Sequence, residues 1–397
     1  MSQFTVPCVI YRGGTSRGLF FHEKDLPADH ELRKWIFLKG VGSEDASHIN
    51  GLGGASSHTS KAVVISPSER EDIDIDYTFI QLGLGDQTVD LEGTCGNLMA
   101  AVGAYAVDEQ LVPVRRNDRS KVVRVWSTNM NFELRIHVPL IEGRAKVTGS
   151  YKMPGVHDKG AKYVVEIINP GGGKTGETLP LGAQNKLSIG NRSTSSHTPT
   201  DIEYSMVDLI NPFVYIRATV LELNGTELNQ EVSLRVEALR SLEDIRAEVA
   251  VQCGFAQDQR EAKEKSKAIP KIAYVAPPQD YLTSNGSLIS KSDHDILTRM
   301  TSMGRMHRSF AVSGLLNLAA ACLIPGTIPY QLCQKKIAEN VPVVIRIGHP
   351  EGVIAILVDY DRKTGQVRSV GLERTARRIM GGDLFIPDRT GISPNIE

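Results

Sequence analysis

Hydrophobic and polar residues alternate in short runs along most of this chain, and a period of two predicts β-strands. The predicted strands cover residues 6–11, 19–21, 62–65, 73–82, 121–126, 132–138, 163–168, 213–220, 272–275, 343–347 and 353–360. Helical periodicity predicts helices over residues 29–38 and 242–253. A third helix is predicted over residues 292–300, where Ser292 and Asp293 can cap the first turn.

Two further helical segments, residues 96–107 and 313–323, are apolar on nearly every side and rich in alanine. A helix of this kind must be surrounded by protein, and each segment is too short to span a bilayer. The opening Cys95-Gly96-x-Leu98 recurs as Ser313-Gly314-x-Leu316 half a chain later. The sequence therefore predicts an α+β fold of two similar domains, each with a buried central helix wrapped by strands.

Polar and Gly/Pro-rich stretches indicate where one domain ends and the next begins. A length of 397 residues suits two domains of ordinary size. The stretches at residues 169–175 and 191–200 favour a boundary or long loop near residues 180–200. We expect a first domain over residues 1–185 and a second over residues 186–397, whose C-terminal strand returns to the first.

Composition and charge exclude several classes of protein. The 45 basic and 46 acidic residues give a formal net charge of -1, without a basic tract for nucleic acid. No apolar segment approaches the roughly 20 residues of a membrane helix. The N-terminus also lacks the basic and apolar runs of a secretory signal. We therefore expect a cytoplasmic protein that binds neither nucleic acid nor membrane.

Cysteines, histidines and glycines lack the spacing of known cofactor sites. The 5 cysteines occur singly, which argues against disulfides, zinc ribbons and iron–sulfur clusters. The 10 histidines show no H-x-x-x-H spacing. Residues 171–175 (GGGKT) lack the leading glycine of a phosphate loop, and no G-x-G-x-x-G joins a strand to a helix. We expect neither a metal ion nor a cofactor.

The first segment with candidate chemistry is residues 12–18 (RGGTSRG), directly after the first predicted strand. Its glycines let the backbone approach an anion, Ser16 can donate a hydrogen bond, and Arg17 can grip a carboxylate. The alternative is a Gly-rich hairpin turn between the strands at residues 6–11 and 19–21. The local pattern alone slightly favours the hairpin.

The second segment, residues 51–61 (GLGGASSHTSK), leads directly into an apolar strand. Consecutive small and hydroxyl residues expose backbone N–H groups, as an anion site requires, and Ser56, Ser57 and His58 are candidates for substrate binding. Lys61 ends the loop where the strand begins, so its amine should be partly desolvated. Desolvation lowers the pKa of a lysine and makes it usable as a base. The alternative is a flexible loop with an ordinary surface lysine.

The third segment, residues 93–97 (GTCGN), opens the first buried helix. A thiol at a helix N-terminus feels the positive end of the helix dipole, which favours the thiolate. The N–H groups there, with Gly96 and Asn97, can hold a substrate carboxylate while charge develops on it. The alternative is a buried structural cysteine, but the flanking glycines and polar residues argue against simple core packing. Cys95 is the strongest single signal in the chain.

The fourth segment, residues 302–309 (SMGRMHRS), leads to the second buried helix. Its arginines, histidine and hydroxyls can bind a second carboxylate, with Ser302 and His307 as the candidate residues. The alternative is an ordinary charged connection. Lys271, just before the strand at residues 272–275, is a further candidate partner for an anion.

These segments together resemble a known family. A Cys-Gly-Asn that opens a buried helix, echoed by a second such helix, is similar to the diaminopimelate-epimerase-like fold. The resemblance implies two domains, each a β-barrel-like sheet wrapped around a central buried helix, which face each other across an active-site cleft. More specifically, RGGTSRG (12–18), GLGGASSHTSK (51–61), EGTCGN (92–97) and ERTARR (373–378) resemble motifs of the PrpF family. That family contains 2-methylaconitate cis-trans isomerases and related tautomerases, and the resemblance covers essentially the whole chain.

The resemblance implies cofactor-independent proton transfer next to a carboxylate, with Lys61 and Cys95 as the catalytic pair. Epimerases of this fold carry a second cysteine where this chain has Ser313, so a symmetric two-thiol racemase is not expected. The implied function is 2-methylaconitate cis-trans isomerisation in the methylcitrate pathway of propionate catabolism. Oxalomesaconate tautomerase and methylitaconate isomerase are the alternatives. The residues leave open which of Lys61 and Cys95 is the base.

Two other classes of function compete with an isomerase. A Cys–His hydrolase would use Cys95 as nucleophile with His58 or His307, and a non-catalytic accessory protein would bind a partner aconitase. As ligand we expect a small polycarboxylate substrate. A homodimer and a functional pairing with an aconitase-type dehydratase are further predictions about partners.

Overall fold

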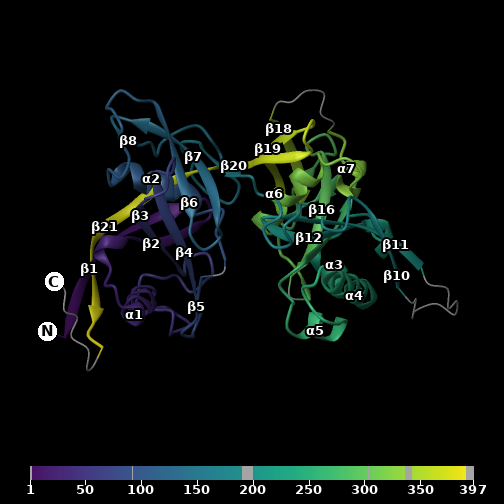
Figure 1. Cartoon of the computed structure of the whole chain (residues 1–397), viewed down its shortest axis with the longest axis horizontal. Helices are drawn as coiled ribbons and strands as arrows, with labels where there is room; N and C mark the ends of the chain where they lie inside the picture. The colour runs from purple at the N-terminus through teal and green to yellow at the C-terminus, as the bar shows by residue number, and fades with distance from the viewer. Residues whose placement is uncertain (1, 92, 190–199, 303, 336–341, 390–397) are drawn as a thin grey trace. The chain divides into compact units, whose positions relative to one another are not determined.

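The computed structural model describes residues 2–91, 93–189, 200–302, 304–335 and 342–389 (Figure 1). The chain forms two compact units, of which the first comprises Met1–Ile168 with Glu373–Glu397 and the second comprises Asn169–Leu372. The first boundary therefore lies at Ile168 instead of near residue 185, and the last residues of the chain return to the first unit. The polar run at residues 191–200 lies, except for Thr200, outside the described residues.

The first unit is a mixed sheet with two α-helices. Its elements are β1 (Gln3–Gly13), β2 (Ser16–His22), a 3-10 helix (Glu23–Asp25), α1 (His30–Val41), β3 (Lys61–Pro67), β4 (Ile75–Leu82), β5 (Val89–Asp90), α2 (Met99–Asp108), β6 (Ser120–Ser127), β7 (Phe132–Ile141), β8 (Arg144–Ala145), β9 (Tyr163–Ile168) and β21 (Ala376–Pro387). The main strands follow the order β21-β1-β2-β3-β4-β6-β7-β9. The pairs β2–β3 and β4–β6 are parallel, and the other neighbours are antiparallel.

The β1 strand packs against a helix on each of its two faces. Its successive side chains point to opposite sides of the sheet. Cys8 and Ile10 share a hydrophobic cluster with Ile36 of α1. Tyr11 points to the other face, where its ring centroid lies 6.0 Å from that of Tyr105 in α2. The two helices of this unit therefore cover opposite faces of the same strands.

The α2 helix is enclosed by the sheet of the first unit. It contacts β1, β6, β7, β8, β9 and β21, which come from both ends of the strand order. Every residue from Met99 to Val107 is buried. Gly103 permits a close approach to β7, since a Cβ at this position would lie 2.6 Å from Ile136. The predicted buried central helix is confirmed here.

The second unit is built from a second mixed sheet. Its elements are β10 (Asn185–Ile189), β11 (Thr200–Leu209), β12 (Asn211–Arg217), a 3-10 helix (Ala218–Leu221), α3 (Asn229–Ser233), α4 (Val236–Gln252), α5 (Gln259–Glu264), β13 (Lys271–Ala276), β14 (Tyr281–Leu282), β15 (Leu288–Ile289), β16 (Ile296–Ser302), β17 (Arg305–Met306), α6 (Val312–Ala321), α7 (Ile328–Leu332), β18 (Val343–His349), β19 (Gly352–Asp361) and β20 (Gln366–Arg374). The main order is β10-β11-β12-β13-β16-β18-β19-β20, with β12–β13 and β16–β18 parallel.

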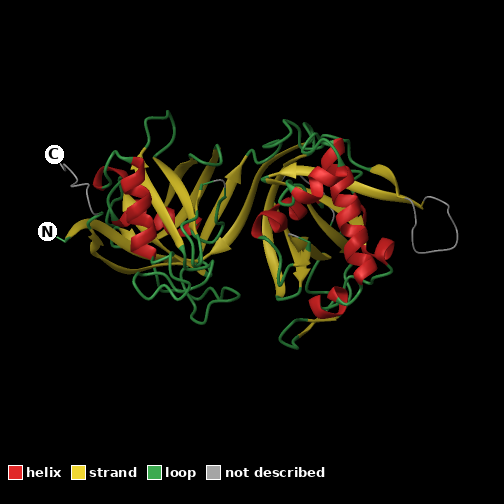
Figure 2. Cartoon of the chain, turned by 90° about the horizontal axis from the view of Figure 1, so that it is seen from below, coloured by secondary structure: helices red, strands yellow, loops and turns green. Residues whose placement is uncertain are grey.

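The two units repeat one strand pattern. The series β1-β2-β3-β4-β6-β7 matches β11-β12-β13-β16-β18-β19 both in order and in the direction of every pairing. The α6 helix precedes β18 as α2 precedes β6, and it is buried from Gly314 to Ala321. Figure 2 shows strands as the main component of both units. The predicted α+β fold of two similar halves, each around one buried helix, is confirmed.

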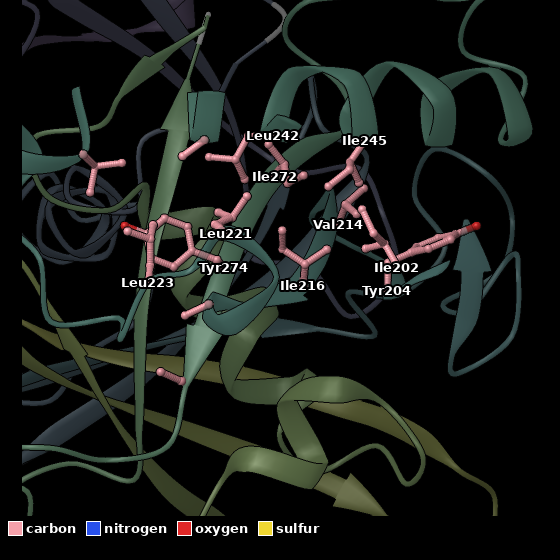
Figure 3. Close-up of a cluster of buried hydrophobic side chains, with 14 of the residues drawn as sticks. Ile202, Tyr204, Val214, Ile216, Leu221, Leu223, Leu242, Ile245, Ile272 and Tyr274 are labelled. Atoms are coloured by element: carbon pink, nitrogen blue, oxygen red, sulfur yellow. The ribbon is translucent and has the colours of Figure 1, made fainter. Parts of the chain in front are cut away.

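The face of the second sheet opposite α6 is covered by α4. Figure 3 shows Leu242 and Ile245 of α4 beside Val214 of β12 and Ile272 of β13, all within one hydrophobic cluster. These side chains are fully buried, and burial of each stabilises the fold by ~1.5–3 kcal/mol. None of the described helices is long and apolar enough to cross a membrane.

The helix predicted over residues 292–300 is wrong. Residues 290–295 form a turn, and the strand β16 begins at Ile296. Every residue of β16 up to Thr301 is buried, polar as well as apolar, so the segment lacks the alternation of buried and exposed positions by which a half-buried strand is recognised. Asp295, just before β16, accepts hydrogen bonds from Arg346 of β18 and so contributes to strand pairing instead of helix capping.

The GGGKT loop binds the carboxylate of Asp208, a residue of the same chain. The backbone N–H groups of Lys174 and Thr175 donate to Oδ2 of Asp208 at 2.9 and 2.6 Å. The Thr175 hydroxyl donates to the same oxygen at 2.8 Å. Because these donors bind the buried Asp208 carboxylate, they are not available to a nucleotide phosphate. The loop instead fixes the end of β11, which carries Asp208.

Asn317 provides a test of how α6 is fixed. Its buried Nδ2 donates to the carbonyls of Val207, Leu209 and Asn211 at 2.9, 3.1 and 2.9 Å, and its Oδ1 accepts from the Tyr215 hydroxyl at 2.8 Å. Asn317→Leu would leave these buried groups without partners. We expect the free energy of unfolding, measured by chemical denaturation, to fall by ~3 kcal/mol or more.

The matched control for this change is the exposed Asn224, whose replacement by alanine should alter the free energy of unfolding by less than ~0.5 kcal/mol. If Asn317→Leu costs no more than Asn224→Ala, the hydrogen bonds of Asn317 do not fix α6.

Candidate active site

Lys61 is a buried amine at the first position of β3. Its side chain is 7% exposed, and its Nζ donates to Oε1 of Gln81, which lies opposite it on β4. Nζ also lies 5.2 Å from the centroid of the Phe79 ring. Burial lowers the pKa of Lys61, because desolvation disfavours the ammonium, while the charge of Cys95 acts in the opposite direction. The amine is therefore desolvated, as its position at a loop-to-strand junction predicts.

Gln81 orients the Lys61 amine. Its Nε2 donates to the carbonyls of Ser60 and Leu82 at 2.9 and 3.2 Å. Because these carbonyls engage the amide nitrogen, the amide oxygen faces Lys61. Sequence reasoning missed Gln81, since its role depends on the register of β3 and β4.

Cys95 lies in the turn that leads into α2. The helix itself begins at Met99, whose N–H donates to the carbonyl of Cys95 at 3.3 Å, so the thiol precedes the first helical residue by about one turn. The thiol is half-buried and donates to Oγ of Ser16 at 3.7 Å. Ser16, the first residue of β2, is 2% exposed. The structure thus brings together Ser16, Lys61 and Cys95.

Residues 12–18 form the hairpin turn that their local pattern favours, with Gly13 opposite Ser16. The turn also packs against the segment after Cys95. A Cβ on Gly13 would lie 2.5 Å from the backbone oxygen of Asn97, and one on Gly14, where φ is +53°, would lie 2.4 Å from its Oδ1. Only glycine permits this approach, which places Ser16 beside the thiol.

Asn129 fixes the segment that precedes Cys95. Its Nδ2 donates to the carbonyls of Leu91 and Gly93 at 2.8 and 3.0 Å, and to that of Phe79 at 2.9 Å. The hydrogen bonds tie this loop to β4. Nothing near Asn129 in the sequence indicates this role, because its partners are distant along the chain.

The second predicted segment forms a loop held by Arg17. The Arg17 N–H donates to the backbone carbonyl of His58 at 2.9 Å, and its Nη2 donates to that of Leu52 at 3.3 Å. Ser56 hydrogen-bonds Thr59 through their hydroxyls at 3.0 Å. The side chains of the remaining two candidates, Ser57 and His58, are exposed.

The second unit gathers the other three candidates. Lys271 is the first residue of β13, and the pairing of Ile272 with Thr301 places it beside Ser302. Burial lowers the pKa of Lys271. Burial also lowers the pKa of His307, as does the positive charge of Lys271. Lys271, Ser302 and His307 therefore form one cluster.

The repeat makes this cluster comparable with the site of the first unit. Lys271 begins β13 as Lys61 begins β3. Asn211 begins β12 and donates through Nδ2 to Oγ of Ser313 at 2.9 Å, as Ser16 begins β2 and bonds Cys95. Ser313 lies within the first turn of α6 and replaces the thiol. Of these two matched positions, the first unit pairs its lysine with a thiol and the second unit pairs its lysine with a hydroxyl.

Neither the buried Lys61 nor the half-buried Lys271 has a carboxylate partner among the described residues. No carboxylate contributes to the lowered pKa of Lys61 or of Lys271. Perturbed, uncompensated charges of this kind are typical of sites that bind an anionic ligand. In the described part of the chain, no group of three or more His, Cys, Asp or Glu is arranged to hold a metal ion.

Known proteins resemble this chain along its whole length. A family model described as PrpF protein matches residues 3–387. The 3-methylitaconate isomerase of Eubacterium barkeri is 39% identical over 97% of this chain and 98% of that protein. The 2-methyl-aconitate isomerase of Shewanella oneidensis is 33% identical over 97% of this chain and 98% of that protein. The 4-oxalomesaconate tautomerase of Pseudomonas putida is 30% identical over 97% of each.

A solved structure agrees with this relationship. The crystal structure of methylitaconate-delta-isomerase superposes with a TM-score of 0.89 at 37% identity and covers 100% of both chains. The family model spans residues 3–168 of the first unit and all of the second unit. The resemblance carried by the four sequence motifs is confirmed, and the chain belongs to the PrpF family.

Proposed function

We propose that this protein is an isomerase that moves a proton on a small unsaturated polycarboxylate, with Lys61 and Cys95 as the acid/base pair. The observation that carries this function is a desolvated amine, held by Gln81 and coupled electrostatically to a half-buried thiol, with no carboxylate to neutralise it. The names of the three relatives, two isomerases and a tautomerase, support the same class of reaction.

Lys61 serves as the base in this proposal, because burial favours its neutral form. The amine removes an allylic proton from the substrate and becomes an ammonium, and the electron pair spreads through the double bond into a carboxylate. The Cys95 thiol then gives its proton to the far carbon, which moves the double bond. The resulting ammonium and thiolate attract each other, consistent with the effect of Cys95 on the pKa of Lys61, and proton return from one to the other restores the site.

The remaining candidates hold the substrate in this proposal. Anion binding in the first unit is assigned to the residues that line the hairpin, the 51–61 loop and the turn before α2, namely Ser16, Arg17, Ser56, Ser57, His58, Gly96 and Asn97. In the second unit it is assigned to Lys271, Ser302 and His307. Arg17 already holds the loop through its guanidinium, so its contribution is to position the loop as well as to add positive charge.

The proposed substrate is 2-methylaconitate, and 3-methylitaconate is the second candidate. The higher identity to the 3-methylitaconate isomerase, 39% against 33%, favours testing both acids side by side. Both would react through the same allylic proton removal. A Cys–His hydrolase has less support, because the hydrogen-bond partner of Cys95 is Ser16 and the side chain of His58 is exposed.

Solvent exchange tests the proposed reaction. Purified protein in deuterium oxide should introduce deuterium into 2-methylaconitate or 3-methylitaconate and shift the double bond, as followed by NMR. Lys61→Ala and Cys95→Ala should each lower the rate by about 100- to 10,000-fold, since each removes one partner in proton transfer.

The control variants are the half-buried Cys253→Ala and the exposed Lys363→Ala, which should exchange deuterium at the wild-type rate. Absence of exchange by the wild-type protein with every unsaturated polycarboxylate tested would contradict the proposed function. Full activity of Cys95→Ala would refute the assignment of the thiol.

Gln81→Glu tests Lys61 as the base through the pH profile. A carboxylate next to the amine favours the ammonium and raises the pKa of Lys61. The base must be neutral to accept a proton, so the rising limb of kcat/KM against pH should move to higher pH and the rate at neutral pH should fall. The exposed Gln334→Glu is the control for added charge. An unchanged profile, or one displaced to lower pH, would exclude Lys61 as the base.

A further inference from the structure

Arg374 is a buried arginine next to the hairpin that positions Ser16. It ends β20 within the first unit, and its side chain is 4% exposed. The following residue, Thr375, accepts the N–H of Gly14 through its carbonyl at 2.9 Å. Arg12 also donates to the Thr375 hydroxyl at 2.9 Å. These hydrogen bonds fix the backbone of Thr375 against the hairpin turn. The glycines of that turn pack on Asn97, two residues after Cys95.

The guanidinium of Arg374 lies close enough to Cys95 and Tyr151 for both groups to influence its pKa. Nη1 donates to the backbone carbonyl of Glu373 at 2.8 Å. Nε is buried and has no hydrogen-bond partner in the described structure. An arginine that only stabilised the fold would have this donor satisfied, because an unpaired buried donor costs ~1–3 kcal/mol.

Among the described residues, Arg374 also has no ion pair with a carboxylate. The carboxylate of Glu373 accepts instead from Nζ of Lys162 at 2.7 Å. No carboxylate contributes to the pKa of Arg374, which burial lowers to about 10. The side chain therefore remains a cation at neutral pH. A buried cation without a counter-charge is unfavourable by several kcal/mol, and a bound anion would remove that penalty.

We propose that Arg374, whose buried Nε has no partner, binds a carboxylate of the substrate next to the hairpin that packs on the Cys95 segment. The identity of that anion as the substrate rests on the proposed function. A planar guanidinium can hold a carboxylate through two parallel hydrogen bonds, which also fixes the orientation of the substrate. Arg374 thus acts on the part of the substrate that Cys95 protonates, and it supplies a fixed positive charge beside the neutral base Lys61.

Substrate binding by Arg374 also assists the reaction. When Lys61 removes the allylic proton, negative charge moves into the conjugated carboxylate. A fixed cation next to that carboxylate stabilises the transition state more than the ground state. Loss of the guanidinium should therefore raise KM and lower kcat, whereas a residue that only supports the fold would lower the amount of active enzyme without changing KM.

The test compares Arg374→Gln and Arg374→Lys with Arg377→Gln, which removes the same charge from an exposed position at the start of β21. Thermal unfolding is measured with and without propane-1,2,3-tricarboxylate, a saturated acid that offers carboxylates but no double bond to shift. Steady-state kinetics are measured with the acid that the wild-type protein isomerises.

In the absence of ligand, Arg374→Gln should unfold at or above the wild-type temperature, because it removes an uncompensated buried charge. It should lose the stabilisation that the tricarboxylate gives the wild-type protein, and its kcat/KM should fall about 100-fold with a raised KM. Arg374→Lys should retain part of both effects, and Arg377→Gln should behave as wild type.

Two results would overturn the role of Arg374: wild-type affinity of Arg374→Gln for the tricarboxylate, or a lower unfolding temperature of both Arg374 variants with ligand stabilisation intact. The second result would make Arg374 a structural residue. If Arg374→Gln alone loses the ligand effect while the wild-type protein isomerises no acid, the carboxylate site stands and the proposed function fails.

Discussion

Burial of the Lys61 amine, without a carboxylate partner among the described residues, is the constraint on which the proposed site depends. Moving an ammonium out of water is unfavourable, and the protein compensates only in part, through the amide oxygen of Gln81 and the face of the Phe79 ring. The desolvation cost that remains uncompensated has two consequences. The amine gives up its proton more readily than an exposed lysine, and the site attracts an anion. Both are required of a base that acts on a polycarboxylate.

The sheet register explains how this constraint is met. The apolar segment after Lys61 forms β3 between β2 and β4, so its first residue lies between the hairpin that begins β2 and the end of β4. The turn before α2 packs on that hairpin through Gly13 and Gly14, which brings the thiol to Ser16. The proposed acid/base pair is thus brought together by strand pairing and one glycine-dependent contact.

The internal repeat separates proton transfer from anion binding. Lys271 occupies the position of Lys61 in the second sheet and likewise has no carboxylate partner. Ser313 replaces the thiol, and an alcohol is a far weaker acid than a thiol. The second unit therefore keeps a cation that can bind an anion without an adjacent group to exchange protons. This asymmetry favours a double-bond isomerase with one acid/base pair over a racemase with two equivalent thiols.

The sequence predicts those parts of the fold and site that depend on neighbouring residues. Lys61 and Cys95 lie at junctions of a loop with a strand and of a turn with a buried helix, which the local glycines and hydroxyl residues reveal. Gln81, Asn129 and Arg374 escape prediction because their partners are far away in sequence. The first boundary, at Ile168, coincides with the start of the Gly/Pro-rich stretch at residues 169–175, whereas the return of the chain to the first unit after Leu372 is hidden, because it falls within β20. The helix expected over residues 292–300 fails because a fully buried strand shows no alternation.

The most direct test of this account is the pKa of Lys61, measured by NMR titration of isotope-labelled lysine side chains, with Lys61→Arg to assign its signal. In the free protein the account predicts a value below the ordinary 10.5 of lysine. On binding propane-1,2,3-tricarboxylate, the pKa of Lys61 should rise, since a negative charge nearby favours the ammonium. An ordinary value that does not change when the tricarboxylate binds would contradict the claim that a desolvated, uncompensated amine is the base.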